Sequence, residues 1–394
     1  MKLQRLGSIV VAALAALGCD DADVAVPGGP GAEAAACAPL IEGCLVNQKA
    51  CAVGPDGPAC VLCPETQYAA PTGSCQPIPG TMLSHDFQEF TVKSGQELVG
   101  LCQSWTMNNP TELWVHAVEL LQDEASHHSN WTYVPDDLFD GPDGVWDCDE
   151  RDYSQVEAAL SGGVLYAQST QAAKEVQKFP QGAAIRVPPY ARIIGDVHLL
   201  NTTSAPITGN ARIHIYSGPA EEVTVKLAPF HLTFETLAIP PHAQSRFIGE
   251  CDLEKGFQSA ADRPFGLELY YALPHTHAMG KRFFFEVFGG PDDGKSLIDV
   301  EDFNSEARGR SYDPPLPISG AKGLRFGCEY DNPRDEEVVW GFGDQEMCEM
   351  LGFADSAVVF ESAIHEIVSD GKDGDVKLFT GPCQSLVVPW SNDK

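Results

Sequence analysis

The chain has few basic residues. Its 394 residues include 25 lysines and arginines against 56 aspartates and glutamates, a formal net charge of −31. A surface of this sign repels nucleic acid and anionic lipid headgroups, so we expect no nucleic-acid partner. Long apolar runs are also scarce. The run over residues 6–17 is too short to hold the chain in a membrane as a stop-transfer helix.

That run instead indicates a signal peptide over residues 1–18, because Lys2 and Arg5 precede it and small residues lead up to Cys19. The small residues resemble a bacterial lipobox, which predicts a lipid on Cys19. We therefore expect an exported protein, anchored as a lipoprotein on a periplasmic or cell-surface face, or alternatively secreted. Residues 19–36, rich in Pro, Gly and Ala, are expected to form a flexible tether.

Thirteen cysteines fit an oxidising compartment, and twelve remain once Cys19 is set aside. Six of them crowd into residues 37–75, which predicts a small disulfide-rich module over residues 37–80. The spacing Cys60-x-x-Cys63 could suggest zinc, but the segment contains no histidine, so disulfides are favoured. The other six, whose pairing spacing alone leaves open among fifteen arrangements, are Cys102, Cys148, Cys251, Cys328, Cys348 and Cys383.

Helical periodicity is nearly absent after residue 80. Short alternating or β-branched runs such as 211-ARIHIYSG-218 and 282-RFFFEVF-288 dominate, and turn residues separate them. The pattern predicts an all-β protein with two tandem antiparallel, jelly-roll-like β-sandwiches after the disulfide-rich module. We expect the sandwiches over residues 81–220 and 221–394.

Two histidine clusters are candidate metal ligands. His275 and His277 have i, i+2 spacing, which on a strand sends both imidazoles to the same face. His127 and His128 are adjacent, so on a regular strand they point to opposite faces. They can share a metal only at a strand end, a bulge or a turn.

Two further residues could complete such sites. His198 lies in an alternating run, and Met347 precedes a cysteine in 341-GFGDQEMCEM-350. A thioether is a soft ligand, so a set of two histidines and one methionine favours copper over zinc. Each feature alone is more typical of ordinary strand or core packing.

Taken together and in order, these motifs resemble the copper type II, ascorbate-dependent monooxygenases, the family of dopamine β-monooxygenase and peptidylglycine α-hydroxylating monooxygenase. The resemblance covers roughly residues 82–390. Its order is HH (127–128), VH (197–198), HTH (275–277) and EMC (346–348), with matching flanks that include 101-LCQSW-105, 145-VWDCDE-150, 179-FPQGAAIRVPP-189 and 326-FGCEYDN-332.

The resemblance implies two copper ions per chain, far apart across solvent. The electron-transfer copper would be held by His127, His128 and His198. The copper that binds oxygen would be held by His275, His277 and Met347, which would form the catalytic site. The implied reaction consumes O2 and two electrons from ascorbate or a similar donor, hydroxylates a C–H bond of a small-molecule substrate and releases water. The implied disulfides are Cys102–Cys148, Cys251–Cys383 and Cys328–Cys348.

Departures from the family pattern concern the substrate. Leu273 stands where peptide-processing members carry an arginine for the substrate carboxylate, and Glu349 and Leu351 stand where they carry asparagine and tyrosine. A buried carboxylate needs a cation or several donors, so a peptide ending in glycine is disfavoured. We take these three residues as candidate substrate-pocket positions, with an amine or polar neutral substrate.

Two other functions fit the same sequence. A copper-binding or copper-delivery protein of the cell surface could keep the fold and the ligands without turnover. An adhesion or carbohydrate-binding sandwich could use the histidines structurally. Copper binding would distinguish the enzyme from an adhesion or carbohydrate-binding protein. Ascorbate-dependent O2 consumption would distinguish the enzyme from a copper-binding or copper-delivery protein.

Overall fold

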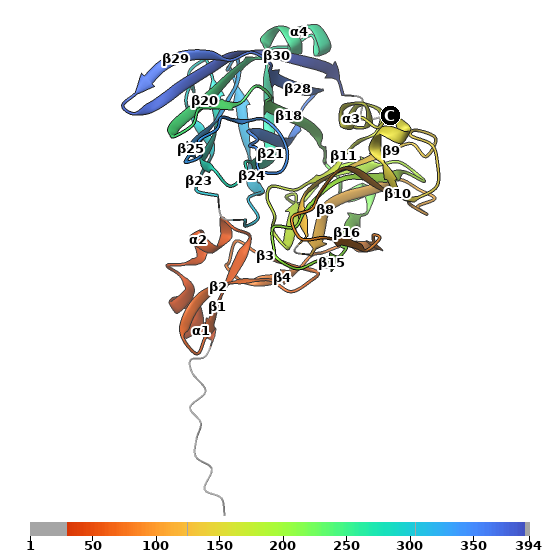
Figure 1. The fold of residues 1–394 in the computed structure, drawn as a ribbon. Coiled ribbons are helices and arrows are strands. Elements are labelled where there is room, and N and C mark those ends of the chain that lie inside the picture. The colour runs from red at the N-terminus through yellow and green to blue at the C-terminus, as the bar shows by residue number, and fades with distance from the viewer. Residues whose placement is uncertain (1–29, 124, 304, 391–394) are drawn as a thin grey trace, which may run out of the picture.

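The computed structural model describes residues 30–390 except 124 and 304, and most of its regular structure is β-strand. Two β-sandwiches follow a small disulfide-rich module, which lies against both of them (Figure 1). This confirms the expected fold class. The predicted signal peptide and Cys19 lie outside the described residues. Within residues 30–390, no described helix is long and apolar enough to cross a membrane.

The module is held by disulfides rather than by a metal. Its bonds are Cys37–Cys51, Cys44–Cys60 and Cys63–Cys75. Its elements are α1 (Pro30–Cys37), α2 (Ile41–Leu45), the hairpin β1 (Lys49–Gly54) and β2 (Gly57–Leu62), and the hairpin β3 (Gln67–Ala69) and β4 (Cys75–Pro77). Residues 30–36, which we expected in the flexible tether, instead form α1, because the run Glu33-Ala-Ala-Ala has high helix propensity and Cys37 anchors its end.

The first sandwich pairs a five-stranded with a six-stranded sheet. One sheet has the order β10 (Gly144–Asp147), β7 (Glu97–Thr106), β14 (Arg192–Leu200), β9 (Ser126–Val134) and β11 (Gly163–Ala167). The other has the order β17 (Val225–Lys226), β13 (Ala183–Val187), β8 (Leu113–Gln122), β16 (Ala211–Gly218) and β5 (Thr81–Asp86), and β12 (Lys174–Lys178) also pairs with β8. Smaller elements are β6 (Phe90–Val92), β15 (Ile207–Gly209), η1 (Cys148–Arg151) and α3 (Gln155–Ser161).

The second sandwich is one long sheet path folded on itself. Its order is β23 (Ser296–Glu301), β22 (Gly280–Phe288), β25 (Gly323–Asn332), β20 (Ala243–Asp252), β30 (Val376–Pro389), β28 (Val358–Ile364), β18 (Ala228–Phe234), β27 (Glu349–Asp355), β21 (Gly266–His275) and β24 (Arg310–Ser319). β30 is long enough to pair with β20 in one half and with β28 in the other. The remaining elements are β29 (Val368–Asp373), β19 (Ala238–Ile239), β26 (Val338–Val339) and α4 (Glu254–Ala261).

Most strand pairs are antiparallel, as expected, but three are parallel: β13–β17, β18–β28 and β20–β30. The boundary expected after residue 220 falls inside η2 (Ala220–Glu222). β17 follows this point in the chain and still pairs with β13 of the first sandwich. The three disulfides that the family resemblance implies, Cys102–Cys148, Cys251–Cys383 and Cys328–Cys348, are all present.

The two sandwiches meet through apolar side chains. The Phe179 ring packs edge-on against Phe353 and Tyr271, with ring centroids 5.2 and 6.1 Å apart. Tyr271 and Phe353 belong to the second sandwich, yet they are buried in the same cluster as the core of the first. The contact buries aromatic surface from water, which favours a fixed arrangement of the two sandwiches.

Candidate metal centre and cavity

The first three candidate ligands lie on two neighbouring strands of one sheet. His198 on β14 pairs directly with His128 on β9. The register then shifts, so that Leu199 pairs with Ser126 and His127 is left as the extra residue of a bulge. A bulge re-aims a side chain that regular alternation would turn to the other face. The bulge is one of the three local irregularities that we expected the adjacent pair to require for a shared metal.

The second set lies at the end of a strand and in loops. His275 is the last residue of β21, and His277 lies in the turn beyond it. Strand alternation therefore does not bring the two rings together as expected; the turn does, with ring centroids 5.0 Å apart. Met347 precedes β27 and is buried.

The two histidine sets lie against each other. The ring centroids of His127 and His277 are 5.0 Å apart, and those of His128 and His275 are 4.9 Å apart. The expectation of two sets far apart across solvent is therefore wrong for this structure. The aromatic contact between the sandwiches brings the second set onto the first.

Each of the five imidazoles presents one buried nitrogen that has no hydrogen-bond partner. These atoms are His127 Nδ1, His128 Nε2, His198 Nδ1, His275 Nε2 and His277 Nε2. The ligand atoms of His127, His128 and His277 lie within 4.8 Å of one another. A buried, unpaired polar atom is costly, and five of them converging in one place fit metal ligation.

The opposite nitrogens of three rings are held by acceptors. His198 Nε2 donates to Glu97 Oε1 at 2.7 Å, His275 Nδ1 to the Ser169 carbonyl at 2.8 Å, and His277 Nδ1 to the Gln345 carbonyl at 2.8 Å. This arrangement is typical of metal-ligating histidines, because it fixes the tautomer and leaves the other nitrogen free to bind.

The cluster favours neutral imidazoles. Burial first, and then the neighbouring histidines, lower the pKa of His127 to about 2. Burial and the nearby His275 lower the pKa of His277 to about 3. Burial also holds the pKa values of His128, His198 and His275 below their usual range. Neutral imidazole is the form that binds metals.

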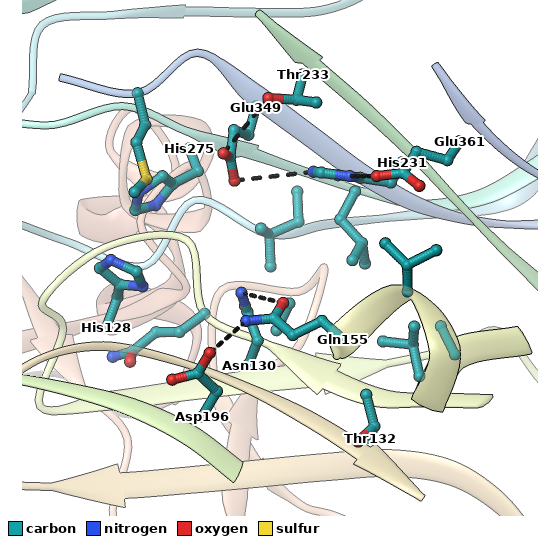
Figure 2. A pocket seen from close by; sticks show the side chains of 18 of the residues that line it. His128, Asn130, Thr132, Gln155, Asp196, His231, Thr233, His275, Glu349 and Glu361 are labelled. Atoms are coloured by element: carbon teal, nitrogen blue, oxygen red, sulfur yellow. Dashed lines mark hydrogen bonds and ion pairs between the residues drawn. The ribbon is translucent and has the colours of Figure 1, made fainter. Parts of the chain in front are cut away.

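A cavity of about 280 Å³ opens beside the cluster, between the two sandwiches. His128, His198, His275 and Met347 line it, together with all three candidate pocket residues, Leu273, Glu349 and Leu351. In Figure 2, Asn130, Gln155 and Asp196 form one wall, and Glu349, His231 and Glu361 form the opposite wall. Aliphatic and aromatic side chains make up most of the remaining lining.

Glu349 is part of a charged trio. His231 lies between two carboxylates, with Nε2 3.7 Å from Glu349 Oε2 and Nδ1 3.5 Å from Glu361 Oε1 (Figure 2). Burial disfavours the charge on His231, but the two carboxylates outweigh it and raise its pKa to about 10. Burial would raise the pKa of Glu349, but His231 lowers it to about 2. The charge of His231 is therefore shared between two carboxylates, those of Glu349 and Glu361.

Sequence reasoning missed several polar residues of the site, among them His231, Glu361, Glu97 and Glu346. A usable signal existed for two of them. His231 and Glu361 each interrupt an apolar run, in 228-APFHLTF-234 and 358-VVFESAI-364, and they pair in register on β18 and β28. A lone ionisable residue inside a buried strand needs a partner, which marks it for attention.

Comparison with known proteins assigns no family. No family model matches the chain, and no curated protein matches it. Among solved structures, the major capsid protein P2 of Bacteriophage PM2 aligns with 10% identity and a TM-score of 0.27 over 70% of this chain and 97% of that one. The Cowpea mosaic virus top component aligns with 9% identity and a TM-score of 0.31 over 68% and 89%. At these scores the likeness carries no functional argument.

Proposed function

We propose that this protein is a copper-dependent monooxygenase that hydroxylates a C–H bond of a small organic substrate, with O2 and a one-electron reductant such as ascorbate as co-substrates. The observation that carries the proposal is the convergence of five unpartnered imidazole nitrogens beside a cavity that is lined by His128, His198, His275 and Met347. A donor set of imidazoles and one thioether suits copper better than zinc.

In this proposal His127, His128 and His198 hold one copper ion, and His275, His277 and Met347 hold the other. Bound copper would supply one-electron redox chemistry with O2. The chain's own residues fix the ligands: the Ser169 and Gln345 carbonyls orient His275 and His277, and Glu97 orients His198. The largely apolar cavity walls would surround a substrate's hydrocarbon part beside the second set.

Metal content and oxygen chemistry test the proposal directly. Copper-loaded protein, dialysed and analysed by mass spectrometry, should retain two equivalents and should consume O2 in an ascorbate-dependent reaction that hydroxylates a member of a substrate panel. One retained equivalent would contradict two separate sets and favour a shared site at His127, His128 and His277. No bound copper would exclude the function.

Met347→Leu gives the sharpest variant, because it removes the sulfur and keeps the volume. Hydroxylation should be lost while one equivalent of copper stays at the first set. Met350→Leu is the matched control, since Met350 is fully buried in the core of the second sandwich and is absent from the cavity lining. Equal activity of both variants would contradict the role of Met347.

The alternative function is copper binding or delivery without turnover. Such a protein would use the same copper ligands as the monooxygenase but would not react with O2. Two bound copper ions, with no ascorbate-dependent O2 consumption against any substrate of the panel, would favour this function over the enzyme.

We propose an amine as the substrate class. Among the cavity-lining residues that the structure describes there is no lysine or arginine, and the charge of His231 is already paired with Glu349 and Glu361, so a substrate carboxylate would find no unpaired cation. The two carboxylates around His231, and Asp196 on the opposite wall, instead favour an ammonium group, and the apolar lining favours a hydrocarbon body. Turnover of amines but not of glycine-extended peptides is the expected result. Efficient peptide hydroxylation would contradict it.

We also propose that Cys19 carries a lipid that anchors the protein to a membrane. The lipobox-like sequence before Cys19 supports the proposal, and the six disulfides fit an exported protein. Cys19→Ser should move the protein from the membrane fraction to the soluble fraction. Retention of the variant in the membrane fraction would overturn the anchor.

A further inference from the structure

One residue of the disulfide-rich module, Gln48, contacts both sandwiches. Gln48 Oε1 accepts from the Val176 amide on β12 of the first sandwich at 2.8 Å, and Gln48 Nε2 donates to the Gly309 carbonyl of the second sandwich at 2.9 Å. The Gln48 backbone has φ of 52°, the left-handed region that a non-glycine residue adopts at a cost. The module thus holds this side chain between the two sandwiches.

The next residue makes a second contact with the same segment of the second sandwich. Lys49 Nζ forms an ion pair with Glu306, and both side chains are partly buried. The Glu306 carbonyl also accepts from Thr170 Oγ1 of the first sandwich at 2.7 Å. Residues 306–309 are therefore held by the module and by the first sandwich together.

A continuous chain of hydrogen bonds leads from this segment to a candidate ligand. The Arg308 amide donates to Ser169 Oγ at 2.8 Å, and the Gly309 amide donates to Glu175 Oε1 at 3.2 Å. Glu175 also accepts from the Ser169 amide at 2.9 Å. The Ser169 carbonyl then accepts from His275 Nδ1. A shift of residues 306–309 would disturb the group that orients His275.

The module itself is anchored firmly to the first sandwich. Lys174 on β12 is buried, and its ammonium donates to three module carbonyls, those of Cys63, Pro64 and Gln67, at 3.0, 2.5 and 2.7 Å. Its charge is balanced by the buried Glu119 at 2.8 Å. A cation that satisfies three backbone acceptors in a buried site fixes the position of the module.

We propose that the disulfide-rich module is an interdomain clamp. Docked on the first sandwich, it holds residues 306–309 of the second through Gln48 and Lys49, and so keeps His275 and His277 against His127 and His128. Gln48 and Lys49 are positioning residues that touch no ligand of the cluster. The clamp is a property of the metal-free chain, so its test stands or fails independently of copper.

The test measures the distance between the sandwiches in metal-free protein. Spin labels attached to unnatural amino acids at Val99 on the first sandwich and Val368 on the second, both exposed, report that distance by pulsed electron resonance without new cysteines. The parent should give one narrow distribution. Gln48→Ala with Lys49→Ala should give a broader distribution with a longer mean. An unchanged distribution would overturn the clamp.

Hydrogen exchange separates a clamp from general support of the fold. In the double variant, exchange should rise at least about tenfold in peptides covering residues 306–311 and 168–170 and stay unchanged in β8 and β16 beneath the module. A uniform rise that includes β8 and β16 would overturn the proposal, because it would mean that the module only stabilises the first sandwich.

Two controls and a rescue complete the design. Glu65→Gln weakens a module contact with Arg212 and His214 of the first sandwich alone, and Gln76→Ala removes a glutamine bonded only within the module; neither should change the distance. Lys49→Glu should broaden the distribution, and adding Glu306→Lys should restore it. Failure of this charge swap to restore the distance would contradict the role of the ion pair.

Discussion

In the first sandwich, His128 and His198 face each other across neighbouring strands, whereas in the second, His275 ends its strand and His277 lies in the turn beyond it. The first set is therefore positioned by the register of one sheet and a single bulge. Backbone hydrogen bonds between β9 and β14 hold that register within one sheet of the first sandwich.

The second set depends on loop contacts and on the other domain. The Glu346 carboxylate accepts from the amides of His277 and Met279, at 2.9 and 2.7 Å, and so shapes the turn. The His275 ring is oriented by Ser169 of the first sandwich. We conclude that the first set is preorganised within its sheet, while the second is assembled by buried loop contacts. Substitutions in the loops should therefore affect metal binding at the second set and leave the first set unchanged.

The largest expected effect follows from removing the Cys102–Cys148 disulfide, which should destabilise the first sandwich but leave His127, His128 and His198 in place. Cys102 and Cys148 are 46 residues apart in sequence, so the double change Cys102→Ser, Cys148→Ser should cost about 4 kcal/mol of unfolding free energy. The register of β9 and β14 does not involve this bond. Denaturant unfolding should show the loss, and copper analysis should still find the first set occupied.

That outcome would break down if the variant lost its copper at His127, His128 and His198 under conditions where it remains folded. The geometry of the first set would then rest on the disulfide and not on the sheet, and the contrast between the two sandwiches would fail.

The second prediction concerns the turn of the second set. Glu346→Ala leaves the buried amides of His277 and Met279 without acceptors, which should cost about 3 kcal/mol. Because the turn carries His277, copper should also be lost from the second set while the first set keeps its own. Copper stoichiometry and denaturant unfolding measure both effects. Full occupancy of both sets would show that the turn is held by other contacts.

Short-range pattern was the weaker signal for the first set, yet its condition that His127 and His128 lie at a strand end, bulge or turn matches the structure. A bulge at His127 follows from local strand geometry, because two adjacent histidines cannot otherwise share a face. The i, i+2 spacing of His275 and His277 correctly predicted that the two rings lie close together. It attributed this to strand alternation, which is wrong because β21 ends at His275. No local pattern could reveal Ser169 as the partner of His275. These residues are 106 positions apart and meet only through the packing of two domains.

The disulfides show how the family resemblance and the residue pattern differ. Six dispersed cysteines gave no pairing by spacing, and the resemblance supplied the three pairs that the structure contains. The same resemblance implied histidine sets far apart, and the structure has them in contact. Strand scaffolds follow from sequence pattern, whereas the distance between domains depends on interface side chains such as Phe179 and Phe353.

The third prediction tests how far the sheet alone orients its ligands. Glu97→Ala removes the acceptor of His198 Nε2, which should weaken copper binding at the first set by about tenfold. Glu97→Gln keeps an acceptor oxygen and should have a smaller effect. Competitive titration with a copper chelator measures the affinity. An unchanged affinity for Glu97→Ala would mean that strand register fixes the ring completely.

The smallest effect is expected at Asp344, which lies in the same loop as Glu346 but at the surface. Its carboxylate is exposed and pairs with the half-buried Arg334 at 3.0 Å, so Asp344→Asn should change the unfolding free energy by less than about 1 kcal/mol. Copper occupancy of the second set should stay complete, as measured beside Glu346→Ala. If Asp344→Asn instead released copper, exposed charges and not buried acceptors would hold this loop, and the second set would depend on salt concentration.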